Sequence, residues 1–287
     1  MEYSIDMVRL KSRYNTFDLE PLMKRLSVDN RVEYWKMYNF KSYRHNFKVT
    51  ETSEFSYYIG IEHNMKRTNV KKDIVVEYNP SKFEYSSDSL LFWILYNYFY
   101  DDFIVVSVDV SIDIDKNIKE LYFDRNYKRS YKIFASNTGV TYYFGEGDGR
   151  IKVYDKKKEQ ESKGKKVDRE NWTRIEYSLK IGENVDNIDN LYKKISMIDI
   201  YKISDIEVKD RTTRALLYAV KNGYDIKELS RDYRKKIKNI ISQEKINISE
   251  AKINETIKEY FENYRDMLKG YIDLIILDEN EKNRMSI

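Results

Sequence analysis

The sequence predicts an α+β fold: an antiparallel-rich central sheet with flanking helices, followed by a helical C-terminal region. Three observations support this prediction. Segments such as 103–114 alternate between apolar and polar side chains, which is typical of half-buried strands. The apolar residues within 86–100 instead recur at helical spacing. Past residue 210 the alternation gives way to helical periodicity, so we expect one α+β domain at 1–210 and a helical region at 211–287.

The elements follow in order along the first domain. Strands are expected at about 3–13, 32–48, 54–63, 72–79, 103–114, 140–145, 150–156 and 171–179, with a mixed segment at 116–135. A helix is expected at about 17–26 with Thr16 as its N-cap, and another over 86–100. The glycine-rich run 145–149 predicts a hairpin turn. It lacks the lysine and serine or threonine that end a nucleotide-binding loop, so a plain turn is favoured.

The C-terminal region reads as three helices. The first covers 211–222 and ends at Gly223, a residue typical of the position after a helix. The second begins at Asp225, with Glu228 three positions later in a capping-box arrangement. A longer helix follows over about 249–269, and the tail after Leu277 is expected to be polar and loose.

Composition narrows the class of protein. The 287 residues include no cysteine, which excludes disulfides and thiolate zinc sites. No run of eighteen apolar residues is present, so we expect no membrane span, and the start lacks the apolar core of a secretory signal. A cytoplasmic location follows as an expectation. The net charge is only +4, but the stretch 150–174 holds ten basic residues against five acids, which suits a phosphate backbone.

Three predicted strands carry polar side chains on one face. Alternation places Lys152 and Tyr154 together on one strand, Arg174 and Glu176 on another, and Asp109 and Asp113 on a third. The ordinary explanation of this pattern is a sheet with one solvent-exposed face. If the strands are neighbours, however, the carboxylates converge beside a tyrosine, and carboxylates are the ligands that Mg²⁺ and Mn²⁺ prefer. The two histidines, His45 and His63, are not adjacent on a strand face, so such a metal site rests mainly on carboxylates, alone or with one histidine.

A series of short motifs completes the picture: YSIDMVRLKSRY at 3–14, VEYNPSK at 76–82, VDVSID at 108–113, YYFGEGDGRIKVYDKKKE at 142–159 and WTRIEYSLK at 172–180. Their order resembles the replication initiators of Gram-positive rolling-circle plasmids, the Rep-trans group, and the related phage-type replication initiation proteins. The resemblance covers roughly residues 1–210 and implies a replication-initiator nuclease-like fold.

The resemblance also implies an activity. In that family a tyrosine nicks one DNA strand at an origin, stays attached to the 5′ phosphate and later rejoins the strand. The tyrosine of the YDKKKE motif is Tyr154, and the acid of the WTRIE motif is Glu176. A divalent ion, Mg²⁺ or Mn²⁺, is expected on Glu176 with Asp109 and Asp113 as the best further ligands. Lys156 and Arg174 are candidates to offset the charge that develops on the phosphate. A homodimer and a host helicase as partner are expected from the resemblance.

The segment EQESKGKKVDREN at 159–171 has no apolar periodicity and is expected to be a flexible loop. Basic side chains in and around this loop and in the second C-terminal helix are the candidates for DNA binding. They are Arg150, Lys152, Lys157, Lys158, Lys163, Lys165, Lys166, Arg234, Lys235 and Lys238. Lysine-rich segments of this kind are also common as plain solvated surface. The sequence therefore predicts a metal-dependent DNA nicking and closing enzyme, a tyrosine endonuclease. The alternative is a non-cleaving initiator of the same fold that binds an origin and recruits host replication proteins.

Overall fold

The computed structural model describes residues 1–35, 43–63, 71–83, 86, 88–124, 130–136, 139–190, 194–203 and 206–285. Within these ranges, ten strands belong to a large antiparallel-rich sheet and three to a small one, and helices accompany both, so the α+β prediction is confirmed. Contacts group the chain into two compact units. Unit 1 comprises 1–3, 111–177 and 194–251, and unit 2 comprises 4–110, 178–193 and 252–287. The domain boundary expected at residue 210 stays a prediction.

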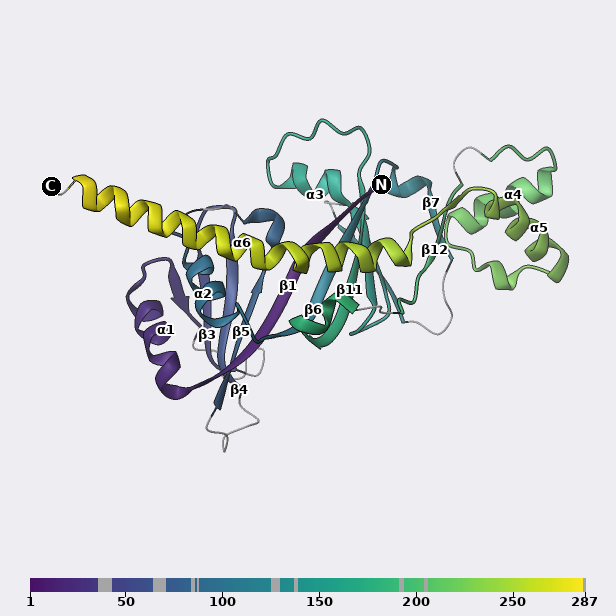
Figure 1. Cartoon of the computed structure of the whole chain (residues 1–287). Helices are drawn as coiled ribbons and strands as arrows, with labels where there is room; N and C mark the ends of the chain where they lie inside the picture. Colours follow the sequence, from purple (N-terminus) through teal and green to yellow (C-terminus); the bar gives the residue numbers. More distant parts are fainter. Residues whose placement is uncertain are drawn as a thin grey trace. The chain divides into compact units, whose positions relative to one another are not determined.

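In unit 2 the strand order is β2 (Val32–Tyr34), β3 (Tyr43–Thr50), β4 (Ser56–His63), β5 (Lys71–Tyr78), β1 (Glu2–Asn15), β6 (Ile104–Ile114) and β11 (Thr173–Asn184) (Figure 1). The last two strands also contribute residues to unit 1. β1 pairs antiparallel with β5, with Leu10 opposite Val76. Both of these side chains are fully buried, as expected for the interior of a sheet covered on that face.

Where unit 2 is described, it contains three α-helices: α1 (Thr16–Val28), α2 (Leu90–Tyr98) and nearly all of α6 (Glu250–Met285). α1 is capped one residue earlier than predicted, because the backbone N–H of Asn15 donates to the Asp18 carboxylate and β1 leads directly into the helix. The side chain of Ser89 accepts from a backbone N–H of α2, which therefore begins later than residue 86. The Tyr264 hydroxyl of α6 donates to the Phe99 carbonyl oxygen at 3.0 Å and fixes α6 in this unit.

In unit 1 the large sheet has the order β6, β11, β10 (Arg150–Asp155), β9 (Gly139–Phe144) and β8 (Tyr131–Ser136). β9 and β10 form the predicted hairpin, and Gly145, Gly147 and Gly149 in its turn all have positive φ. The small sheet has the order β13 (Lys245–Ile246), β12 (Asp199–Lys202) and β7 (Leu121–Asp124). Its described residues also form the helices α3 (Lys156–Ser162), α4 (Arg211–Lys221) and α5 (Arg231–Ser242). The short 3₁₀ helices in the described parts of the chain are η2 (Pro80–Lys82), η3 (Ile118–Glu120), η4 (Val185–Asn190) and η5 (Ile226–Glu228).

Several predicted boundaries were wrong. The strand expected over 150–156 ends at Asp155, whose side chain accepts from the Lys158 N–H at 3.0 Å and caps α3. This helix covers the first residues of the segment expected to be a loop, 159–171. The second C-terminal helix begins at Arg231, because Asp225 caps the separate η5 instead. The tail after Leu277 continues α6 as a helix to Met285. The strand expected over 32–48 appears as β2 and β3, and 36–42 lie outside the described residues.

No helix among the described residues is long and apolar enough to cross a membrane.

The tight packing of β4 gives a prediction for the fold. A Cβ on Gly60 would lie 2.6 Å from the Tyr58 hydroxyl oxygen and 2.7 Å from the Tyr43 ring. Since these rings are buried, Gly60→Ala should lower the free energy of unfolding by about 1–3 kcal/mol, the usual cost of overpacking. Urea unfolding midpoints measure this loss.

The matched control is Gly270→Ala in α6, where an added Cβ meets nothing within 4 Å. There alanine should stabilise the helix by up to about 1 kcal/mol. A Gly60→Ala protein as stable as the native chain would contradict the packing described for β4.

Candidate active site on strands β10 and β11

The three strands that carry the candidate residues are neighbours, because unit 1 has the strand order β6, β11, β10. The opposite face of the two central strands is the core: Ile151, Val153, Ile175 and Tyr177 are completely buried. This apolar face fixes which side chains share the polar face, since a slip of one residue would exchange the two faces. The alternation predicted for these strands is therefore confirmed.

Tyr154 and Glu176 are in direct contact on the polar face. The Tyr154 hydroxyl donates a hydrogen bond of 2.6 Å to one carboxylate oxygen of Glu176. The second oxygen accepts from the Lys152 ammonium at 3.0 Å. Tyr154 is 7% exposed and Glu176 8%, so this bond lies largely shielded from water. In a short hydrogen bond between a phenol and a carboxylate, the carboxylate can act as a base and accept the phenol proton.

Two ammonium groups lie close to the same tyrosine. Lys152 places its nitrogen 4.1 Å from the centre of the Tyr154 ring, in cation–π geometry. Lys156 places its nitrogen 3.5 Å from the Tyr154 hydroxyl oxygen and also forms an ion pair of 2.8 Å with Glu159. The strand expected over 150–156 would have placed Lys156 on the same face as Tyr154 by alternation. Lys156 reaches the tyrosine instead from the first residue of α3, where the N–H groups of Lys156 and Lys157 both donate to the Trp172 carbonyl oxygen.

Asp113 and Arg174 form an ion pair of their own. Two nitrogens of the Arg174 guanidinium donate to the two oxygens of Asp113, each at 2.7 Å. Both side chains are nearly buried, and the guanidinium also lies 5.8 Å from the centre of the Trp172 ring. Bidentate pairs of this kind hold both partners in a fixed geometry. Asp113 and Arg174 therefore brace β6 against β11 beside the tyrosine.

The expected metal ligands are not gathered into one cluster. Among the described residues no group of three or more Asp, Glu or His side chains could hold a metal ion. Asp113 is engaged by Arg174, and Asp109 belongs to unit 2. One carboxylate, Glu176, reaches the tyrosine directly. A magnesium ion often binds through one or two carboxylates with the remaining positions left to water and phosphate, so Glu176 alone is compatible with that kind of site.

A small pocket opens beside the tyrosine. It has a volume of about 130 Å³ and is lined by Val140, Thr141, Lys152, Tyr154, Asp155 and Glu159. Small-molecule sites usually measure roughly 300–1,000 Å³, so this pocket admits a group of about phosphate size. Glu159 was missed by the sequence analysis. Its three-residue spacing from Lys156 would have indicated it, had a helix been predicted there.

The candidate DNA-binding residues differ in their surroundings. Seven of them are exposed on unit 1: Arg150, Lys158, Lys163, Lys165, Lys166, Lys235 and Lys238. Lys157 donates to the Glu170 carbonyl oxygen at 3.2 Å, and Lys163 pairs with Glu159. Arg234 donates to the carbonyl oxygens of Lys227 and Leu229 and holds η5 against α5, which gives it a structural role.

No protein-family model and no curated protein matches this sequence. Among solved structures, the chain is similar to a rolling circle replication initiator protein from Geobacillus stearothermophilus. The identity is 13%, the TM-score is 0.38, and the match covers 84% of this chain and 97% of that one. A similarity this low establishes neither the fold nor the activity of this chain, so its function is inferred from the site itself.

The ion pair beside the tyrosine gives a prediction about stability. Asp113→Ala leaves a nearly buried guanidinium without its carboxylate, and breaking a buried pair costs about 3–5 kcal/mol. The free energy of unfolding of the metal-free protein, measured in urea with a chelator present, should therefore fall by about 3 kcal/mol.

The control is Glu146→Ala in the hairpin turn, which breaks the exposed pair between Glu146 and Lys132 and should cost less than about 1 kcal/mol. If Asp113 were instead a metal ligand surrounded by other acids, its removal would relieve repulsion, and the metal-free protein would become more stable.

Proposed function

We propose that this chain is a DNA nicking and closing enzyme that starts rolling-circle replication, with Tyr154 as the nucleophile. The observation that carries the proposal is the 2.6 Å hydrogen bond from the Tyr154 hydroxyl to Glu176, with two ammonium groups around the same phenol. A tyrosine with an ordinary pKa near 10 is a poor nucleophile at neutral pH. An adjacent base that takes the proton as the bond forms removes that handicap.

The chemistry follows from the positions of these side chains. The Tyr154 oxygen attacks the phosphorus of the scissile phosphodiester, and Glu176 accepts the phenol proton. The bond from phosphorus to the 3′ oxygen breaks, and the 3′ oxygen takes a proton from water, to which Glu176 then gives up the phenol proton. The 5′ phosphate stays on the tyrosine, and the reverse reaction with a 3′ hydroxyl closes the strand. Lys152 and Lys156 lie where they can offset the negative charge that develops on the phosphate.

A divalent ion, Mg²⁺ or Mn²⁺, remains part of the proposal. When bound it would polarise the scissile phosphate and stabilise the leaving oxygen. Glu176 is the residue that would hold it in this chain, because its carboxylate is the one in contact with Tyr154.

DNA would bind across the basic surface around α3. Lys158, Lys165 and Lys166 are exposed there, within the same unit as Tyr154. Phosphate contacts by such lysines release counterions, so binding should weaken steeply with salt. A host helicase and a second copy of this chain stay as proposed partners.

A second candidate function is a DNA-binding initiator that does not cut. The observation that favours it is the basic surface of α5, where Lys235 and Lys238 are exposed and could contact DNA without any nucleophile. In this alternative the bond between Tyr154 and Glu176 serves stability alone.

Replacing the proposed nucleophile separates the two functions. The substrate is a supercoiled plasmid that carries the gene for this chain with its flanking DNA, incubated with protein and Mn²⁺. Tyr154→Phe removes only the hydroxyl, so nicking should fall by about 10³-fold or more, and the covalent protein–DNA adduct should vanish from denaturing gels. Binding of single-stranded DNA should persist.

The matched control is Tyr143→Phe. Tyr143 lies on the neighbouring strand, opposite Lys152 and on the same face, and should tolerate the change with nicking intact. Nicking by the Tyr154→Phe protein at the native rate would show that Tyr154 is not the nucleophile. If neither the native protein nor the Tyr154→Phe protein nicks the plasmid, the non-cleaving initiator is favoured.

The role of Glu176 gives a further prediction. Glu176→Gln keeps the shape but cannot accept the phenol proton, so nicking should fall by about 10²–10⁴-fold even at saturating Mn²⁺. A chelator should abolish nicking by the native protein. If excess Mn²⁺ restores the Gln variant to the native rate, Glu176 acts only as a metal ligand. Glu146→Gln in the exposed hairpin turn serves as control.

A further inference from the structure

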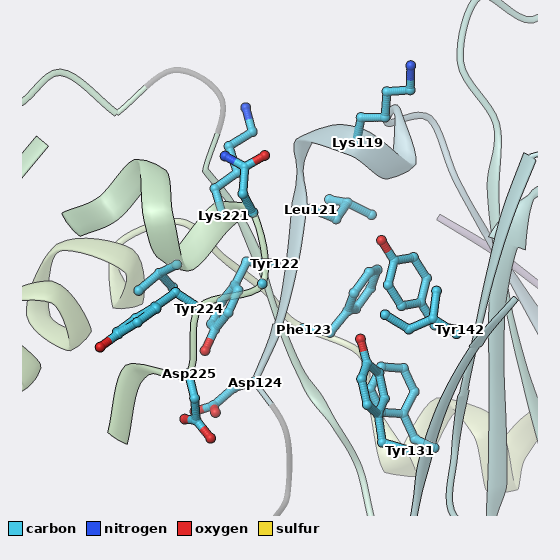
Figure 2. A pocket seen from close by; sticks show the side chains of 15 residues that line it. Lys119, Leu121, Tyr122, Phe123, Asp124, Tyr131, Tyr142, Lys221, Tyr224 and Asp225 are labelled. Atoms are coloured by element: carbon cyan, nitrogen blue, oxygen red, sulfur yellow. The ribbon is translucent and has the colours of Figure 1, made fainter. Parts of the chain in front are cut away.

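Unit 1 contains a second and larger pocket on a different part of its surface. It has a volume of about 480 Å³ and lies between β7, the β8–β9 hairpin and the turn that follows α4 (Figure 2). All its lining residues fall within unit 1, and Tyr154 and Glu176 are not among them. The volume is in the range of small-molecule sites.

The walls of this pocket are aromatic. Phe123, Tyr131 and Tyr142 lie on one side in Figure 2, and Tyr122 and Tyr224 on the other. Phe123 packs against the Tyr142 ring, with centroids 5.1 Å apart. Tyr224 is 47% exposed, so its ring stands at the surface, where an incoming group can reach it. Because Tyr122 and Phe123 are successive residues of β7, they point to opposite sides of that strand, whose ribbon runs between the two groups in Figure 2. A flat ring would therefore stack on one group of rings, and the exposed Tyr224 offers such a face.

Charged groups of opposite sign lie at different ends. In Figure 2 the ammonium ends of Lys119 and Lys221 point to one end, and the carboxylates of Asp124 and Asp225 lie at the other. Burial raises the pKa of Asp124; the nearby charge of Lys238 opposes this shift, and the acids Asp199 and Asp225 add to it. Burial also raises the pKa of Tyr142. Both shifts indicate that these two side chains are poorly hydrated.

A nucleotide matches this arrangement. Its base is a flat ring that stacks on aromatic side chains, its exocyclic amino group donates to carboxylates, and its phosphate pairs with lysines. An extended peptide along β7 is the main competitor, since β7 ends the strand order of the small sheet. The exposed ring of Tyr224, with the carboxylates of Asp124 and Asp225 near it, favours a planar ring that carries an amino group over a peptide backbone.

We propose that this pocket binds one unstacked base of single-stranded DNA, with an exocyclic amino group directed toward Asp124 and Asp225 and the adjoining phosphate toward Lys119 and Lys221. The inference rests on DNA being the ligand of this chain, as proposed above, but not on the chemistry at Tyr154.

The test uses the full-length Tyr154→Phe protein, so that no cleavage occurs. The probe is an oligothymidine of about ten nucleotides, within the usual size of single-strand sites, carrying one internal 2-aminopurine. This fluorescent base has an amino group and loses its emission when it stacks on an aromatic ring. Binding should quench it, whereas the anisotropy of an end label reports the total DNA affinity.

Tyr224→Ala removes one wall of the pocket. It should abolish most of the quenching and weaken binding by about 5- to 150-fold, the equivalent of about 1–3 kcal/mol for one base–aromatic stack. The matched control is Tyr218→Ala, since Tyr218 is 69% exposed on α4 and does not line the pocket. Asp124→Asn should keep the stacking but reduce the preference for a single internal guanine over thymine in a competition assay.

The outcomes separate the two proposals. Binding of the labelled oligonucleotide without quenching, or quenching that survives Tyr224→Ala in a variant folded by circular dichroism, overturns the base pocket and leaves the proposed nicking activity standing. Equal loss with Tyr218→Ala also overturns it. Absence of any DNA binding by the chain overturns both proposals together.

Discussion

The hydrogen bond between Tyr154 and Glu176 is the interaction on which the candidate site depends, and the core on the opposite side of the sheet fixes its geometry. Ile151 and Val153 hold β10 in place, and Ile175 does the same for β11, all three completely buried. A shift of either strand by one residue would place these apolar side chains on the polar face and separate the phenol from its carboxylate. The 2.6 Å hydrogen bond between Tyr154 and Glu176 is therefore set by the packing of apolar residues on the other face of the sheet.

Charge balance is the second constraint, because a nearly buried carboxylate is costly unless positive groups compensate it. Glu176 has Lys152 as its direct partner, and Lys156 lies near the phenol while bound to Glu159. The arrangement has a chemical consequence. In the proposed reaction Glu176 would lose its charge when it takes the phenol proton, and Lys152 would then interact with a phosphate instead. The same ammonium would thus stabilise the resting site and also the charge that forms during that reaction.

Sequence alternation correctly predicted which face of its strand each side chain lies on, but not which side chains contact one another. Alternation placed Tyr154 and Glu176 on shared faces of β10 and β11, and the structure confirms it. By the same rule Asp109 and Asp113 were equivalent candidates for the metal site. The partner of a side chain, however, depends on its register with the neighbouring strand, which alternation does not give. Asp113 forms an ion pair with Arg174. The helix at Lys156 was missed because a charged run has no apolar periodicity to indicate it. The aromatic pocket was out of reach for another reason: its walls come from segments about a hundred residues apart, and no local pattern joins them.

The two sites of unit 1 lie on opposite faces of the same strand, which constrains how one DNA molecule could occupy both. Thr141 pairs with Tyr154 and lines the small pocket at the tyrosine, whereas Tyr142 pairs with Val153 and lines the aromatic pocket. Successive residues of a strand point to opposite faces, so a base held at Tyr142 cannot belong to the scissile phosphate at Tyr154. A strand bound at both must pass around the edge of the sheet, where β8 ends the strand order. The aromatic pocket would therefore hold DNA several nucleotides from the cut, and its contribution would be to affinity and register and not to the chemical step.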